Sequence, residues 1–347
     1  MSRVLVVTSG PPFAEGGHLV VARSLVEALR EAGHESSLLV TLQNRFGRNT
    51  STYLANWLAD VGMTHDGRVI DQVISLRGPA YAVRHPAHVC WLNHRLREYY
   101  DLWPRFLAGL SWKARIKERL RRRLIHAVDR YLLTRNVKRL FAQSGTIKAR
   151  LVRFGAIPSE VLYPPPPPRA YRCDGYGDFI LAVSRLTPLK RLDLAVRALA
   201  HPSAAGARLV IAGHGEEAGA LQALARETGV AARVEFAGAV ETSRLVDLLA
   251  RCRAVCFPPY DEDYGFVTVE AFASGKPVIT CRDSGGPAEL VTDGREGFVC
   301  PPTPEALGRA IGMLTADRAA AERMGAAGRA VADAMSWEHA VRRLLLA

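Results

Sequence analysis

The segments "RVLVVTS" (3–9) and "GHLVVARSLVEALREAG" (17–33) are typical of a buried β-strand followed by an amphipathic helix that ends at Gly33. Similar short apolar runs occupy 35–41, 71–76, 88–93, 139–144, 178–184, 208–213, 234–238, 254–259 and 277–281. In the later part of the chain they are separated by helical patterns near 190–200, 217–228, 242–251 and 265–274. Strands without apolar–polar alternation that are followed by helices favour parallel sheets covered on both faces. We therefore predict an α/β fold.

The stretch "YPPPPPRAYR" (163–172) interrupts this alternation. Five consecutive prolines favour an extended, stiff backbone and exclude a helix or a central strand. We expect an N-terminal Rossmann-like domain over 1–163, a proline-rich linker over 164–172 and a second Rossmann-like domain over 173–336. The two doubly wound sheets are expected to face each other across a cleft, with ligands beyond the carboxyl ends of the strands.

Length and composition fit two ordinary globular domains. The chain has 347 residues, of which 48% are hydrophobic and 23% charged. It contains no apolar run long enough to span a membrane and no secretory signal pattern at the N-terminus, so we expect a cytoplasmic protein. Its six cysteines do not show the spacing of a zinc site and are expected to be reduced, mostly core thiols.

Positive charge is concentrated in the first half of the chain. Residues 1–172 carry 27 Lys and Arg against 12 Asp and Glu, whereas 173–347 carry 19 against 22. The charge is densest over 112–139, where five apolar residues recur every fourth position (Ile116, Leu120, Leu124, Val128 and Leu132). This pattern predicts an amphipathic helix with a cationic opposite face. That face is either simply solvated or attracted to an anionic membrane or acceptor, and nucleic acid is the less favoured partner.

Two loops of the second domain carry candidate ligand-binding residues. Arg185 and Lys190 follow the strand at 178–184, where two cations can neutralise a diphosphate. In "DEDYGFVTVEAF" (261–272), Gly265 opens an apolar helix between Glu262 and Glu270. We expect the small Gly265 to let a ligand approach the backbone.

The first-turn amides of that helix, those of Gly265, Phe266 and Val267, can bind a phosphate oxygen. Carboxylates accept hydrogen bonds from sugar hydroxyls, which is the role expected of the two glutamates. The structural alternative makes Glu262 a helix cap and Glu270 the partner of a buried arginine.

These motifs, with "AFASGKPVI" and "DSGGPAELV", resemble the signature of retaining glycosyltransferases of family 4, which have the two-domain GT-B fold. "AVSRLTPLKRLDLAVRAL", "LVIAGHGEE" and "VEFAGAV" extend the resemblance over nearly all of 173–337. It implies that Arg185 and Lys190 bind the nucleotide diphosphate, Glu262 the donor sugar and Glu270 the ribose. Val240 would lie against the base. Arg191 stands where the family usually has glycine.

The first domain resembles the acceptor side of the same family. Gly16 and Gly17, in "SGPPFAEGGH", match its glycine-rich loop. "HPAHVCWLNHRLREYYDLW" (85–103) resembles a subset in which a histidine follows a strand. This makes His94 the candidate catalytic histidine, with Arg97 beside it. The last stretch, 337–347, resembles the helix that packs back toward the first domain.

The resemblance implies a metal-independent, retaining hexosyltransferase without a cofactor. Its donor would be a nucleoside diphosphate sugar, and its acceptor a glycan, a lipid-linked molecule or a small molecule. The basic helix predicts a further peripheral contact with the inner membrane face and no nucleic-acid partner. Two other functions remain open: a nucleotide-sugar epimerase of the same fold, and a non-catalytic membrane-associated binding protein.

Overall fold

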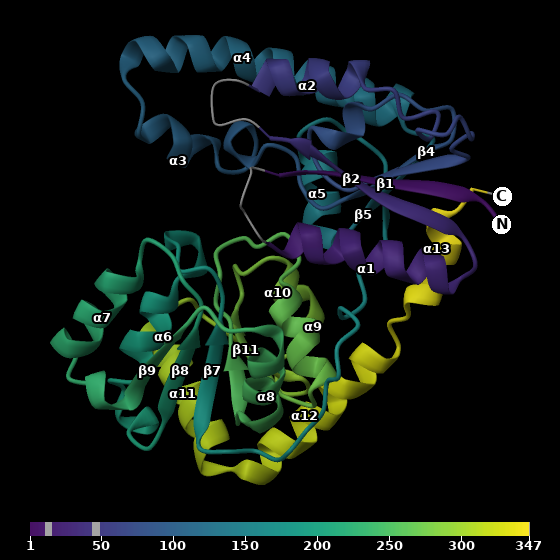
Figure 1. Cartoon of the computed structure of the whole chain (residues 1–347). Coiled ribbons are helices and arrows are strands. Elements are labelled where there is room, and N and C mark those ends of the chain that lie inside the picture. Colours follow the sequence, from purple (N-terminus) through teal and green to yellow (C-terminus); the bar gives the residue numbers. More distant parts are fainter. Residues whose placement is uncertain (11–15, 44–48, 347) are drawn as a thin grey trace. The chain divides into compact units, whose positions relative to one another are not determined.

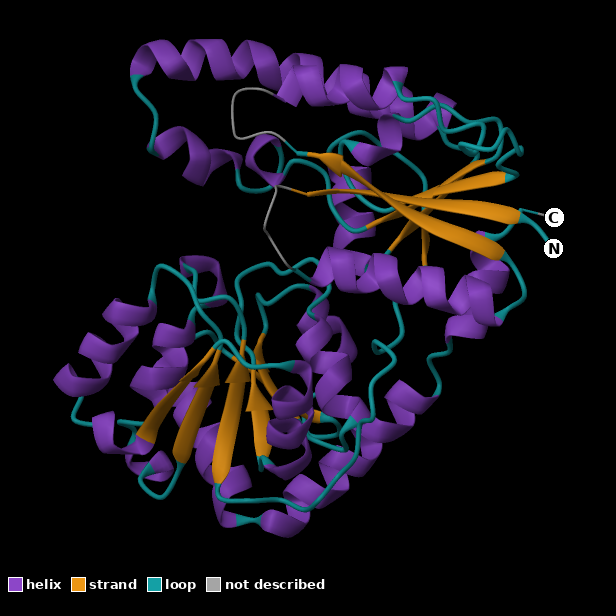
Figure 2. Ribbon diagram, viewed as in Figure 1, coloured by secondary structure: helices purple, strands orange, loops and turns teal. Residues whose placement is uncertain are grey.

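The computed structural model describes residues 1–10, 16–43 and 49–346, and the chain forms two compact units. The first comprises Met1–Pro164 together with Ser336–Ala347, and the second comprises Pro165–Met335. Each unit contains a six-stranded sheet in which every strand pair is parallel, with helices on both faces (Figures 1 and 2). The predicted α/β class with two parallel sheets is confirmed.

The first unit has strands β1 Arg3–Gly10, β2 Glu35–Leu42, β3 Gln72–Ser75, β4 His88–Leu92, β5 Arg139–Ala142 and β6 Glu160–Val161. Its helices are α1 Gly17–Glu31, α2 Asn49–Leu58, α3 Trp103–Ala108, α4 Trp112–Tyr131, α5 Gly145–Arg153 and α13 Trp337–Leu344. Short helical turns occupy Ala80–Ala82, Arg97–Tyr99 and Leu132–Asn136.

The strand order in this sheet is β2-β1-β3-β4-β5-β6. The order reverses between β1 and β3, whose register pairs Val4 with Gln72. In an open parallel sheet this reversal point leaves room for a ligand beyond the carboxyl ends of the two strands. All residues of β3 and β4 are buried, including the polar residues Gln72, Ser75 and His88, and the Ser75 hydroxyl lies 2.8 Å from His88 Nε2.

The C-terminal helix α13 belongs to the first unit. Trp337 packs edge-on against Trp91 of β4, with ring centroids 6.1 Å apart. The side-chain amide of Gln72 donates to the carbonyl of Leu344 at 2.7 Å. Figure 1 shows α13 beside α1, on the opposite side of the sheet from α2 and α4. The last helix therefore completes the core of the unit in which the chain begins.

The second unit has strands β7 Phe179–Val183, β8 Arg208–Ala212, β9 Val234–Gly238, β10 Ala254–Cys256, β11 Val278–Cys281 and β12 Gly297–Cys300. Its helices are α6 Leu192–Ala198, α7 Ala218–Glu227, α8 Thr242–Arg251, α9 Phe266–Ala273, α10 Gly286–Leu290, α11 Pro304–Ala316 and α12 Arg318–Asp333. Short helical turns occupy Pro188–Lys190, Pro202–Ala204 and Ala231–Arg233.

Its strand order, β12-β11-β10-β7-β8-β9, reverses between β7 and β10. The register there pairs Ile180 with Ala254. The loops that follow these two strands therefore begin side by side at one edge of the sheet. They are the loops in which the sequence places Arg185, Lys190 and Glu262.

The proline-rich segment is attached to the second unit over its later part. Arg169 and Tyr171 both bond to Glu270 of α9. Further along, the amide of Asp174 donates to the carbonyl of Ala250 at 2.9 Å. These contacts fix the end of the segment on α8 and α9, so residues 169–174 are part of the packed unit.

The basic helix α4 differs from the expected pattern. The repeated apolar residues Ile116, Leu120 and Leu124 are exposed by 51%, 63% and 53%, on the same side as most cations. The buried side chains of α4 are those of Glu118, Ile125 and Asp129. A spacing of four drifts by about 40° per step on a helix of 3.6 residues per turn, so the row begins on the exposed face and winds toward the core, where Leu132 is buried. Among the described residues, the helices lack the combination of length and apolar character that would cross a bilayer.

Candidate active site

Lys190 and Glu262 form an ion pair at the carboxyl edge of the second sheet. Lys190 ends the turn after β7, and Glu262 lies in the loop after β10. Lys190 Nζ donates to Glu262 Oε1 at 2.7 Å, and the two side chains are exposed by only 14% and 20%. The ammonium also lies 5.5 Å from the ring centroid of Phe257. The sheet reversal thus brings together two residues that the sequence predicted separately.

The backbone around Glu262 is fixed by neighbouring loops. Its amide donates to the carbonyl of Ser284 at 2.9 Å, and its carbonyl accepts from the amide of Gly286 at 3.0 Å. The amide of Tyr260 donates to the carbonyl of Leu189 at 2.7 Å. The carboxylate of Glu262 is therefore carried by a loop that is hydrogen-bonded to the turn after β7 and to the loop after β11.

Arg191, which stands where the family has glycine, connects these same loops. Its backbone is left-handed, with φ at 48°, as the usual glycine would allow. Its guanidinium binds both carboxylate oxygens of Asp283, at 2.8 and 2.7 Å. It also donates to the carbonyls of Pro258 and Pro259, at 2.9 and 2.7 Å. Arg191 therefore links the loop after β7, in which it lies, to the loops after β10 and β11.

Gly265 immediately precedes α9 in a left-handed conformation, with φ at 81°. A Cβ atom there would lie 2.7 Å from Pro287 Cγ and 2.9 Å from Phe257 Cε1. Backbone conformation and crowding by these two side chains thus account for this glycine, whereas the sequence had suggested close approach of a ligand. Helix geometry leaves the amides of Phe266 and Val267 in the first turn without acceptors inside the helix. The N-cap residue of α9 is Gly265, which makes no side-chain cap bond, so Glu262 is not the N-cap residue.

Glu270 is buried and paired. Its Oε1 accepts hydrogen bonds from Arg169 and, at 3.0 Å, from the Tyr171 hydroxyl. Burial raises the pKa of this carboxyl group, while the charge of Arg169 opposes the change. Glu270 thus has an arginine partner, as the structural alternative expected, although Arg169 itself is only partly buried.

Arg185 and Val240 lie in loops at the carboxyl ends of β7 and β9. The side chain of Arg185 is exposed, and that of Val240 is partly buried. β7 lies at the sheet reversal, whereas β9 is the edge strand. Arg185 is therefore in the same loop as Lys190, and Val240 lies beyond the end of a strand two places away from β7.

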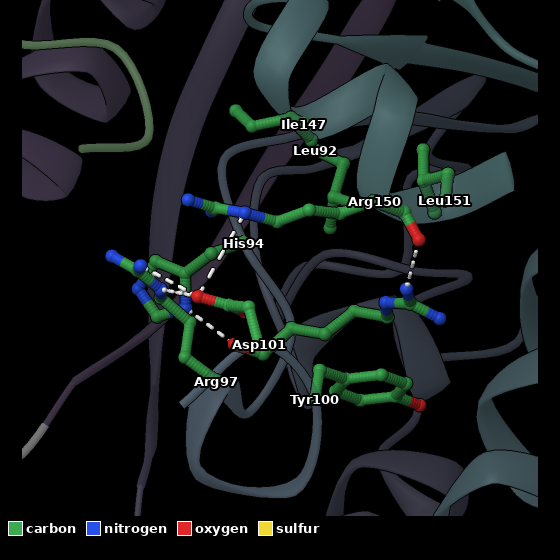
Figure 3. Close-up of a pocket in the computed structure, with 9 residues that line it drawn as sticks. Leu92, His94, Arg97, Tyr100, Asp101, Ile147, Arg150 and Leu151 are labelled. Carbon is green, nitrogen blue, oxygen red and sulfur yellow. Dashed lines mark hydrogen bonds and ion pairs between the residues drawn. The ribbon is translucent and has the colours of Figure 1, made fainter. Parts of the chain in front are cut away.

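The first unit contains a small cavity of about 20 Å³ beyond the ends of β4 and β5. It is lined by Leu92, His94, Arg95, Arg97, Tyr100, Asp101, Ile147, Arg150 and Leu151. Figure 3 shows Arg97 and Arg150 directed at Asp101. The closest nitrogen–oxygen distances are 2.6 Å for Arg97 and 3.7 Å for Arg150. The buried carboxylate of Asp101 thus faces two arginines, Arg97 and Arg150, so positive side chains outnumber negative ones in this pocket.

His94 lies in this cavity beside Arg97, as the sequence predicted for these two residues. Its Nδ1 is 2.6 Å from the carbonyl oxygen of Arg95. A carbonyl can only accept, so Nδ1 donates this hydrogen bond. The carbonyl of His94 also accepts from the amide of Gly78 at 3.1 Å, which ties it to the loop after β3.

Gly16 and Gly17 begin α1 as predicted, with Gly16 extended at φ −175° and Gly17 the first helical residue. Residues 11–15 of the glycine-rich loop lie outside the described residues. A Cβ on Gly16 would lie 3.2 Å from His18 Nδ1. A side chain at Gly16 would therefore crowd the ring of His18 at the start of α1.

Sequence reasoning missed five residues around these sites: Arg95, Asp101, Arg150, Arg169 and Tyr171. A weak signal existed for Asp101, which is four residues after Arg97. Arg169 and Tyr171 follow the proline run directly, in a segment that was interpreted only as a linker. Arg150 is on α5, and only the folded sheet brings it to the end of β4.

Residues 171–331 match the family model described as glycosyl transferases group 1. A D-inositol 3-phosphate glycosyltransferase of Streptomyces griseus is 34% identical over 172 residues, which are 46% of this chain and 36% of that protein. The chain thus aligns with little more than a third of the length of this relative.

Two solved structures match almost the whole chain. A sucrose-phosphate synthase from Thermosynechococcus elongatus has a TM-score of 0.75 at 19% identity, covering 99% of this chain and 97% of the other. Anabaena Alr3699/HepE, solved with UDP and glucose, has a TM-score of 0.69 at 16% identity, covering 98% and 97%. The chain therefore has the two-sheet GT-B fold of these structures, and residues 171–331 are similar to group 1 glycosyltransferases.

Proposed function

We propose that this protein is a retaining, metal-independent glycosyltransferase that moves a hexose from a nucleoside diphosphate sugar to an acceptor hydroxyl. The observation that carries the proposal is the Lys190–Glu262 pair at the reversal point of the second sheet. It lies within the segment that matches group 1 glycosyltransferases. A nucleotide-sugar donor is further supported by the solved Anabaena protein, which contains UDP-glucose in one of its structures.

Lys190 and Arg185 would bind the diphosphate, together with the first-turn amides of α9 around Gly265, Phe266 and Val267. Charge separation is the difficult step, because the bond between the sugar anomeric carbon and the diphosphate oxygen breaks as negative charge develops on the phosphate. Cations and amides already held in place stabilise that charge without reorganising. Lys190 is held in this way by Glu262.

In the proposed reaction the acceptor oxygen attacks from the face that the diphosphate leaves. The acceptor proton passes to a leaving phosphate oxygen, and attack on the same face keeps the anomeric configuration. Glu262 would accept hydrogen bonds from the sugar hydroxyls while it orients Lys190. The cations supply the charge stabilisation, so the proposed chemistry needs no metal ion.

We propose His94 as the residue of the first unit that contacts the transferred sugar, and Glu270 as the one that holds the ribose. His94 lines the cavity of the first unit, and the hydrogen bond from its Nδ1 to the carbonyl of Arg95 fixes its ring. Glu270 would take a ribose hydroxyl in addition to, or in exchange for, Tyr171. Val240 would lie against the base.

The proposed acceptor is a hydroxyl group of a glycan, of a lipid-linked molecule or of a small molecule. We place the enzyme at the inner face of a membrane because α4 carries eight Lys and Arg against two acidic residues, both of which are buried. This basic helix would bring the enzyme to anionic lipids by charge attraction.

A donor screen tests the proposed function. Thermal unfolding is measured with UDP-, GDP- and dTDP-sugars in the presence of a chelator, because a ligand that binds only the folded state raises its stability. We expect one nucleotide series to raise the unfolding temperature, and Lys190→Ala to abolish the shift. The exposed control Arg226→Ala should keep it.

The same donor, labelled in the sugar, separates the possible reactions. Label that leaves the nucleotide for a new molecule identifies a transferase, and label that stays on the nucleotide with changed configuration identifies an epimerase. Binding without release of nucleoside diphosphate under any acceptor would identify a binding protein and contradict the proposal.

A further inference from the structure

The outer face of α4 combines exposed apolar side chains with cations. Trp112, Ile116, Leu120 and Leu124 are exposed by 68%, 51%, 63% and 53%. On a helical projection, Arg115, Arg119, Arg123 and Arg130 lie to one side of this row or along it, and Lys113 and Lys117 lie on the other side. All six cationic residues are exposed. We call the row and these cations the α4 face.

The acidic residues of α4 are withdrawn from this face. Glu118 is buried and accepts from the Tyr99 hydroxyl at 2.9 Å and from Arg121. Asp129 is buried and accepts from the hydroxyls of Tyr53 and Tyr100, at 2.5 and 2.7 Å. Because both carboxylates bond inward, the orientation of the helix is fixed. The apolar row is therefore held outward by a buried polar network and is not a core face that lacks a partner helix.

A groove between α2 and α4 continues the apolar surface. It has a volume of about 470 Å³ and is lined by Tyr53, Leu54, Trp57, Ala82, Ala127, Val128, Tyr131 and Leu132. Leu54 and Tyr131 are exposed by 58% and 56%. The rings of Trp57 and Tyr131 have centroids 6.5 Å apart. Amphipathic aromatic side chains of this kind favour the boundary between water and lipid.

We propose that the α4 face and the adjoining α2–α4 groove dock on an anionic lipid bilayer, with the α4 axis parallel to the membrane surface. The apolar row would enter the headgroup–acyl boundary, and the cations would reach lipid phosphates on both sides of it. A nucleic acid would satisfy the cations but offers no apolar phase to an outward row of Ile and Leu.

This inference deepens the membrane contact proposed above, because it assigns the contact to inserted apolar side chains as well as to charge. Docking by charge alone would leave Ile116, Leu120 and Leu124 without a role. Docking by insertion makes them the larger determinant at high salt, where screening weakens the attraction of the cations.

The test is sedimentation of the full chain with vesicles, without donor or acceptor. One set of vesicles is phosphatidylcholine alone, and in the other about a third of the lipid is phosphatidylglycerol. The triple variant Ile116→Ser, Leu120→Ser, Leu124→Ser keeps every charge. The matched control Val152→Ser, Met313→Ser changes apolar residues that are exposed by 54% and 50% on other helices.

We expect the wild type and the control to bind the anionic vesicles, and the triple variant to bind at least about tenfold more weakly. Equal binding of the triple variant, or no binding of the wild type, would overturn the proposal. So would binding of the wild type to an RNA oligonucleotide but to neither vesicle. Since the changed side chains are exposed, all variants should unfold at the wild-type temperature.

Tryptophan fluorescence gives a second measurement. Trp112 precedes the row, and its ring lies 5.5 Å from Lys113 Nζ. Brominated anionic lipid should quench part of the tryptophan emission, and Trp112→Phe should reduce that part, with Trp57 of the groove accounting for the rest. Quenching that is identical in Trp112→Phe and wild type would contradict insertion of the α4 face. Because no substrate is present, failure of docking and failure of sugar transfer are separate results.

Discussion

The guanidinium of Arg191 and the carboxylate of Asp283 form a two-point ion pair, at 2.8 and 2.7 Å, between the loops after β7 and β11. The same guanidinium donates to two proline carbonyls of the loop after β10. A residue that departs from the family pattern thus organises the three loops around the proposed donor site. Its effect on donor binding can be measured.

Replacing Arg191 by glycine should weaken donor binding. Glycine adopts the left-handed backbone of this position without strain, but it cannot make the four hydrogen bonds of the guanidinium. We therefore expect a net loss of about 1–3 kcal/mol in unfolding free energy. The KM for the donor should rise, because the loop that carries Glu262 loses its support. Denaturant unfolding and steady-state kinetics of Arg191→Gly, with Arg226→Ala as control, check this. A donor KM equal to that of the wild type would contradict the role of Arg191.

Asp101 should position the two arginines of the first-unit cavity. Asp101→Asn removes the charge that faces Arg97 and Arg150, so the variant should lose about 1–3 kcal/mol of unfolding free energy. The KM for the acceptor should rise more than the KM for the donor, because His94 is the one residue of this cavity that we propose to contact the donor sugar. The exposed neighbour Glu98→Gln is the control and should behave like the wild type. A donor affinity that falls as much as the acceptor affinity would refute a role confined to the first unit.

His88 should make the first unit sensitive to acid. Burial, with a smaller effect of His85, lowers its pKa from 6.5 to about 4. Below pH 6.5 the unfolded chain takes up a proton that the folded chain does not accept until about pH 4, so stability falls as pH drops through this window. The loss is up to about 3 kcal/mol.

The measurement for His88 is urea unfolding at several pH values between 4 and 7. His88→Gln should flatten the dependence, whereas the exposed control His65→Gln should leave it unchanged. A wild-type slope that survives in His88→Gln would show that another group titrates.

The sheets were largely predictable from sequence because parallel strands buried on both faces give continuous apolar runs. β6 and β12 were not predicted: the first has only two residues, and the second, "GFVC", lies between loop residues. Which side chains bond to one another was harder to predict from sequence. Lys190 and Glu262 were both predicted, but their direct ion pair follows from the β7–β10 register.

The α4 helix shows the limit of periodicity. The spacing of Ile116, Leu120 and Leu124 correctly predicted a helix but not the face it buries. That face is set by Tyr53, Tyr99 and Tyr100, which bond to its two acidic residues and lie in other elements. Hydrogen bonds to residues far away in the sequence cannot be predicted from the spacing of apolar residues along one helix.

The most direct test of the central claim is turnover of labelled nucleoside diphosphate sugar by Lys190→Ala and Glu262→Gln, with a chelator present and Glu235→Gln as the exposed control. We predict that the wild type and the control transfer the sugar with retained configuration, and that kcat/KM falls at least about a hundredfold in both site variants. Wild-type turnover in both variants would contradict the assignment of this pair to the donor site.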